Sequence, residues 1–313
     1  MDRGLAMSSR TRAPGVIHLL LGVTLACGGL PTGSPGPEPS DEEPTAEDRD
    51  DFGTRNLYPS EPQGRKWAAR WNEHPRTLKA LQVDPYDPEF QMRGSQHTLE
   101  ILGDGTARSS GEIIRFYIGT PDKTWLNTEL TMYAMRVSET SWDPGSSGFE
   151  FQTRTGDGHL EKFESNPAGL DRRCDGHAYS YALRFDGRAV LEKELKHPVY
   201  TNQVTALPWK GQPLPRGTWV GIKVITYDLP GGQVKQELWL DLTDGANGGT
   251  WEKVHEHIDA GGWSIPPEVA ATCRIAPDQR ITTPEPFIIL RNQDIREQWY
   301  KKVTIREIQP PTG

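Results

Sequence analysis

The sequence predicts an all-β protein, a two-sheet antiparallel β-sandwich (jelly roll) with a short N-terminal helical segment. Segments in which apolar and polar residues alternate recur from residue 97 to the C-terminus, as in strands that bury one face. Gly, Asn, Asp and Pro separate these segments. The 313 residues include 32 Gly, 26 Pro and 10 Trp, a composition typical of a turn-rich β protein.

The expected strands follow one another with turn signals between them. Asp186-Gly187 joins one pair as a hairpin, and residues 228–232 join another. Residues 65–81 favour a helix that Pro75 interrupts. So many antiparallel strands in one domain indicate two large packed sheets, and the Trp content predicts some Trp on an exposed concave face. The strands are expected at residues 97–102, 112–118, 125–137, 149–155, 179–185, 189–195, 219–227, 234–240, 251–258, 287–291 and 301–308.

The negative charge is concentrated near the N-terminus. Residues 38–51 hold eight acidic side chains and one arginine, a charge of −7 within a total of −8. The total argues against a nucleic-acid partner, because nucleic-acid binding depends on a basic surface. The remainder is close to balanced and can carry a basic patch, so an acidic polysaccharide is compatible with the charge.

Residues 1–26 have the pattern of an export signal. Basic residues precede the apolar run 16–26, which is too short for a membrane span and ends at Ala26-Cys27. This pattern resembles the bacterial lipoprotein signal. The resemblance implies cleavage before Cys27, lipidation of Cys27, and a lipid-anchored place in the bacterial cell envelope with the membrane as partner. The alternative is an ordinary signal peptide, which would leave the protein extracellular.

The segment after the signal predicts a tether. Residues 27–62 are rich in Pro, Gly and Ser and then in acids, so they cannot bury much apolar surface. Residues 63–313 are expected to form the β-sandwich domain. If Cys27 is lipidated, Cys174 and Cys273 remain, and an oxidising compartment favours a disulfide between them. Two separate buried thiols are the alternative.

One expected strand carries a chemical motif. In 219–228, WVGIKVITYD, Lys223 and Tyr227 are four residues apart and share a strand face. The segment resembles a strand of the concanavalin-A-like jelly rolls of alginate-lyase-like polysaccharide lyases. The resemblance implies that Tyr227 is a catalytic acid or base. In GEIIR, Arg115 keeps a position of the family's arginine strand, and Gln152-Thr153-Arg154 stands where the family has Gln-x-His, with Arg154 in place of the histidine.

The resemblance implies an exported protein that binds a polysaccharide or cleaves it by β-elimination. The alternative is a noncatalytic, lectin-like or structural cell-surface module. β-Elimination of a uronate needs a cation near the carboxylate, a base and an acid. Among the histidines, His159, His177, His197 and one of His255 and His257 are candidates. The predicted catalytic residues are Arg115, His197, Lys223 and Tyr227, and the predicted substrate-binding residues are Gln152, Arg154, His177 and Tyr200.

No metal or other cofactor is predicted. The acidic loop 241–252 could hold Ca²⁺, but a plain hairpin loop fits better because Gly245 occupies a position where a ligand is expected. Residues 249–257 match the opening of a cupin motif through His255 and His257, yet the acid that should follow is absent. Motifs of serine hydrolases, zinc proteases, nucleotide-binding loops and paired-carboxylate glycosidases are also missing.

Overall fold

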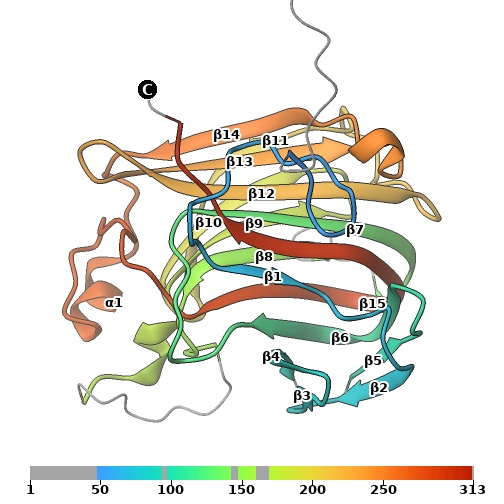
Figure 1. Ribbon diagram of the computed structural model, residues 1–313. Helices are drawn as coiled ribbons and strands as arrows, with labels where there is room; N and C mark the ends of the chain where they lie inside the picture. Colours follow the sequence, from blue (N-terminus) through green and yellow to red (C-terminus); the bar gives the residue numbers. More distant parts are fainter. Residues whose placement is uncertain (1–47, 94–96, 142–146, 160–168, 312–313) are drawn as a thin grey trace, which may run out of the picture. The chain divides into compact units, whose positions relative to one another are not determined.

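The computed structural model describes residues 48–93, 97–141, 147–159 and 169–311 (Figure 1). The predicted signal peptide, Cys27 and most of the predicted tether lie outside the described residues. Within the described part, no helix combines the length and the apolar character that a membrane span requires.

The described residues are mostly strands, which confirms the all-β prediction. The first eight strands are β1 (Lys66–Ala68), β2 (Arg76–Lys79), β3 (Val83–Asp84), β4 (Asp87–Arg93), β5 (Thr98–Ile101), β6 (Thr106–Ile118), β7 (Thr128–Glu139) and β8 (Gly148–Thr155). The others are β9 (Ala178–Arg184), β10 (Ala189–Lys196), β11 (Val199–Ala206), β12 (Trp219–Leu229), β13 (Gln233–Asp241), β14 (Glu252–Asp259) and β15 (Phe287–Glu307). Short helices are η2 (Arg172–Gly176), η3 (Ala246–Gly248) and α1 (Pro267–Thr272).

The two expected sheets are two halves of one continuous antiparallel sheet. Its main order is β11-β10-β9-β8-β15-β7-β12-β13-β14. The long strand β15 joins the halves, because its first part pairs with β8 and its later part with β7. Asp294 and Lys302 have left-handed φ values of 59° and 51° beside the register shifts of β15, as expected for bulges that bend a strand. We call β4, β6, β8 to β11 and the start of β15 the first layer, and β1, β7, β12 to β14 and the end of β15 the second layer.

The core lies between the two layers. Phe151 on β8 and Val224 on β12 belong to one hydrophobic cluster, and burying each side chain contributes roughly 1.5–3 kcal/mol. Thr153 Oγ1 and Thr226 Oγ1 meet 3.0 Å apart across this core. Alternate residues of each strand therefore point inward, and the residues between them point away from the core.

The prediction of a helix over residues 65–81 is wrong. Residues 66–68 form β1 and residues 76–79 form β2, with turns between them. Trp67 and Trp71 are both buried against the ring of Phe90. Pairing of β1 with β15 satisfies the backbone instead, with Lys66 opposite Arg306. Long-range pairing has overridden the local preference.

The end of the predicted tether at residue 62 is also wrong. Residues 48–62 pack on the domain, and the compact unit that contains them spans 44–313. Asp50 Oδ2 accepts a hydrogen bond of 2.9 Å from Thr304 Oγ1, and Tyr58 OH donates one of 2.8 Å to Glu237. Leu57 packs beside Tyr58 against a small buried cluster. Apolar and aromatic residues after the acidic run supply this contact.

Candidate functional site

Three arginines lie side by side on the outer surface of the first layer. Arg93 on β4 is directly opposite Arg115 on β6, and Arg115 is directly opposite Arg291 on β15. Glu150 on β8 continues the row beyond Arg291. Their neighbours along the strands, such as Phe116, face the core, so these side chains point outward. Like charges directly opposite one another destabilise a sheet, and a row of three therefore requires an explanation.

The arginine row, Arg93, Arg115 and Arg291, has fewer acidic partners than cations. Arg291 pairs with Glu150, whereas Arg93 and Arg115 form no ion pair with an acid of the described residues. The Nε atom of each of the three is buried and lacks a hydrogen-bond partner. Burial, and then repulsion from Arg291, lowers the pKa of Arg115. Among the described residues, the three guanidinium groups therefore have one carboxylate partner between them.

A second row of outward residues lies beside the first. Tyr117 is opposite Ile289, which is opposite Gln152. The Tyr117 hydroxyl is buried without a hydrogen-bond partner, and burial raises its pKa, so it stays protonated at neutral pH. Gln152 Nε2 donates a hydrogen bond of 2.8 Å to Glu150 Oε1. We call the two rows together the charged face.

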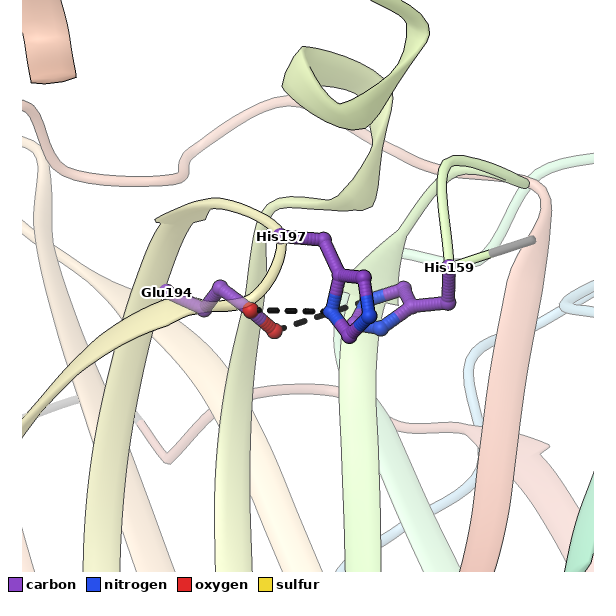
Figure 2. Close-up of side chains that lie close together, drawn as sticks. All are labelled: His159, Glu194 and His197. Atoms are coloured by element: carbon purple, nitrogen blue, oxygen red, sulfur yellow. Dashed lines mark hydrogen bonds and ion pairs between the residues drawn. The ribbon is translucent and has the colours of Figure 1, made fainter. Parts of the chain in front are cut away.

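Two histidines and a glutamate meet at one end of the charged face (Figure 2). Glu194 lies near the end of β10, His197 follows in the turn, and His159 comes from the loop after β8. His197 Nδ1 lies 3.0 Å from Glu194 Oε1, and His159 Nε2 lies 3.7 Å from Glu194 Oε2. The two imidazole rings are 4.4 Å apart between centroids. Burial, and then repulsion from His197 and Arg115, holds the pKa of His159 well below its usual value, so this imidazole is neutral.

Glycines and the disulfide hold these loops together. The expected disulfide between Cys174 and Cys273 is present and links η2 to the end of α1. A Cβ on Gly176 would lie 2.8 Å from the Cβ of His197, and a Cβ on Gly158 would lie 2.2 Å from the backbone N of Gly176. The loop that carries His159 can therefore approach η2 only because both positions are glycine.

Four of the predicted site residues lie on or beside the charged face: Arg115, Gln152, His197 and Tyr200. Tyr200 is 50% exposed and lies directly opposite Glu194 across β10 and β11. The predicted substrate-binding residue His177 is a neighbour, since its charge contributes to the lowered pKa of His159. Burial lowers the pKa of His177, but its contact with Glu285 outweighs burial and the pKa is raised.

Lys223 and Tyr227 lie elsewhere, on the outward side of the second layer. They share a face of β12, as the spacing predicts, and residues of the 48–62 segment cover it. Lys223 is fully buried, and its Nζ donates to Glu129 Oε1 at 2.6 Å. Tyr227 is 2% exposed and donates a hydrogen bond of 3.2 Å to Glu237. No histidine is among the contacts of either residue in the described chain, so neither joins Arg115 and His197.

Arg154 connects the two layers instead of facing outward. Its φ is 53°, and its side chain is 1% exposed. Its Nη1 donates to Asp228 Oδ1 and to the carbonyl of Ile281, each at 2.7 Å. These contacts occupy the guanidinium within the fold, which leaves Gln152 as the outward residue of this strand.

The metal sites considered from the sequence have other partners. Asp241 accepts hydrogen bonds from the backbone of Gly245 and Thr250 and from the hydroxyl of Tyr133. These bonds are typical of a hairpin loop that is stabilised by its own hydrogen bonds. His255 Nδ1 lies 3.2 Å from the hydroxyl of Tyr181. His257 packs edge-on against Trp263.

A cavity of about 810 Å³ lies beside the 48–64 segment, β1 and the end of β15. None of the eight predicted catalytic and substrate-binding residues lines it. The charged face remains the surface where the predicted residues gather.

No protein-family model and no curated protein sequence matches the chain. Solved structures of similar fold include the exoplasmic/lumenal domain of VIP36 with Ca²⁺ and mannose bound, at 10% identity and a TM-score of 0.44, covering 79% of this chain and 93% of that chain. Alginate lyase Aly36B with an alginate trisaccharide matches at 12% identity, a TM-score of 0.42 and coverage of 78% and 98%. The alginate lyase from Aplysia kurodai matches at 10% identity and a TM-score of 0.38, covering 74% of this chain and 98% of that chain. These scores are too low to assign a family or a function.

Proposed function

We propose that the charged face binds an acidic polysaccharide. The observation that carries the proposal is the arginine row, in which three cations stand directly opposite one another with a single acidic partner. Guanidinium groups match carboxylate and sulfate oxygens with paired hydrogen bonds. A bound polyanion would satisfy the buried Nε atoms and relieve the repulsion between the arginines. Tyr200, half-exposed at the edge, offers a flat apolar surface to a sugar ring.

The test compares arginine variants on a panel of acidic and neutral polysaccharides. We expect Arg115→Gln to weaken binding of acidic polymers about ten- to hundredfold, because a hydrogen bond to a charged group contributes roughly 1.5–3 kcal/mol. Arg108→Gln, on the same strand but in an exposed pair with Glu100, is the matched control and should bind normally. The proposal would be overturned if the wild type bound neutral polymers as tightly as acidic ones. It would also be overturned if Arg115→Gln bound acidic polymers with the affinity of the wild type.

β-Elimination is a second candidate, because one face brings together a cation, an acid and a neutral imidazole. Arg115 would neutralise the uronate carboxylate, the protonated Tyr117 would donate a proton to the leaving oxygen, and His159 or His197 would act as base. Ultraviolet absorbance of unsaturated uronate products measures this reaction. Tyr117→Phe should abolish product formation, whereas Tyr227→Phe should retain it. If the wild type forms no product from any acidic polymer, β-elimination is rejected and only the binding proposal stands.

We propose also that Cys27 anchors the protein in the bacterial cell envelope. The disulfide supports export, because disulfides persist in oxidising compartments. Cys27→Ser should release the protein from the membrane fraction into the soluble fraction. Unchanged fractionation of the variant would reject the anchor without affecting the polysaccharide proposal.

A further inference from the structure

The His159, Glu194 and His197 side chains form the one group of three or more potential metal ligands that converges within the described residues, and their ligand atoms all lie within 4.8 Å of one another. They come from two loops and a strand end, as Figure 2 shows. The geometry points to a binding site for a divalent transition metal of the zinc type, with one nitrogen from each histidine and an oxygen of Glu194 as ligands.

His159 gives an independent reason to expect a ligand here. Its side chain is in the core of the loop region, with the residue 2% exposed, yet neither Nδ1 nor Nε2 has a hydrogen-bond partner. The separation of 3.7 Å between Nε2 and Glu194 Oε2 is beyond hydrogen-bond distance. Buried polar atoms without partners are rare in native proteins, and a bound ion is one of the ordinary explanations. The unpaired ring faces the carboxylate that would share the metal.

The donor set fits zinc better than calcium. Two imidazole nitrogens and one carboxylate oxygen are a common set for a zinc ion that keeps a fourth position for water, whereas Ca²⁺ takes six to eight oxygen ligands. With bonds of about 2.0–2.1 Å, tetrahedral ligand atoms lie about 3.3 Å apart, so the most distant of the present atoms need to close by up to about 1.5 Å. The glycine contacts and the disulfide already hold the two loops in place.

Charges around the cluster restrict the kind of ion that can bind. Arg115 and Arg291 are near enough to interact electrostatically with His159, and their positive charges repel cations. The Glu194 carboxylate opposes this repulsion from within the ligand cluster. A metal held through nitrogen bonds tolerates this setting better than one held by charge alone. The ion would lie beside the arginine row and add its charge to the anion-binding face.

A metal would also occupy the imidazoles that β-elimination could use as a base. Metal binding at this cluster and a histidine base are therefore exclusive, and the two can be measured separately. The proposal does not depend on polysaccharide binding, because it concerns the protein and the ion alone.

The test is titration of the full chain, stripped with a chelator, with Zn²⁺ in competition with a chromogenic chelator. We expect each chain to bind one Zn²⁺ ion tightly. Co²⁺ in its place should give the intense visible absorption of a tetrahedral ion. His159→Ala should weaken Zn²⁺ binding by at least about a hundredfold and remove the Co²⁺ spectrum.

A histidine pair that lacks a third ligand serves as the matched control. His255→Ala with His257→Ala, two residues apart on β14, should retain the full equivalent. Glu194→Gln keeps the side-chain volume and covers the case in which His159→Ala does not fold; it should weaken binding at least about tenfold. Absence of saturable Zn²⁺ binding by the wild type would overturn the proposal. So would loss of the ion in the His255/His257 variant, or retention of a tight equivalent in Glu194→Gln.

Discussion

Two surfaces of this β-sandwich bury charged side chains, and the surfaces differ in whether these charges form ion pairs. On the outward side of the second layer, Glu129 lies between two cations, with Lys223 Nζ and Arg306 Nη2 each 2.6 Å from one of its oxygens. On the charged face of the first layer, Arg93 and Arg115 have no acidic partner among the described residues.

Under the binding proposal, this difference separates charges that stabilise the fold from charges that contact a ligand. Paired buried ions hold a fold in one arrangement, and removing one member leaves the other uncompensated. Unpaired buried ions instead mark a place where a further group can bind. Lys223 and Tyr227 resemble catalytic residues in the sequence, but their internal partners and the covering 48–62 segment indicate a structural role. Arg115, by contrast, has no acidic partner among the described residues.

The largest expected effect is on the second layer. Glu129→Gln leaves Lys223 and Arg306 as buried cations without an acid, and should lower the free energy of unfolding by about 3–5 kcal/mol. Urea denaturation measures the loss. Glu100→Gln, which breaks the exposed pair with Arg108, should cost less than about 1 kcal/mol. Equal losses in the two variants would show that the buried pairs have no special structural role.

Strand faces were predictable because alternation has a period of two. In 149–155, Phe149 and Phe151 alternate with Glu150 and Gln152, which indicates which side chains point outward, and the structure agrees. The prediction of a helix at 65–81 failed, and Trp67 lies in β1 and Trp71 in the turn after it. Their burial depends on a strand near the C-terminus, and no local pattern records such pairing.

The candidate site was predictable only in part, for the same reason. Arg115 and Gln152 were anticipated through a family resemblance. Arg93 and Arg291 were missed because only the register of β4, β6 and β15 sets them opposite Arg115. Glu194 and His159 are far apart in sequence and meet through loop packing, so residue spacing carries no signal for the cluster.

A smaller effect is expected from Glu192 on the first layer. Burial, and then repulsion from Glu150, raises the pKa of Glu192 to about 7, although Arg184 lies 2.5 Å away. An acid whose pKa is raised on folding contributes stability below its unfolded pKa and loses it as pH rises through its folded pKa. Between about pH 4.5 and 7, the wild type should therefore lose about 1–3 kcal/mol that Glu192→Gln retains.

Urea denaturation of both proteins across this pH range measures the difference. The two curves of stability against pH should separate as pH rises, with the variant above the wild type. Glu100→Gln, at an exposed position, should run parallel to the wild type. A Glu192→Gln curve that also runs parallel to the wild type would mean that this glutamate is ionised as readily in the folded as in the unfolded chain.

The smallest expected change in stability belongs to the residue with the largest expected role in binding. Arg115→Gln removes a cation that lies opposite two other arginines, so the free energy of unfolding should stay constant or rise by up to about 1 kcal/mol. Urea denaturation in the absence of polysaccharide measures this. A loss of several kcal/mol, as expected for Glu129→Gln, would place Arg115 among the structural charges and remove the contrast between the layers. Unchanged stability with lost polysaccharide binding would instead show that Arg115 serves a ligand and not the fold.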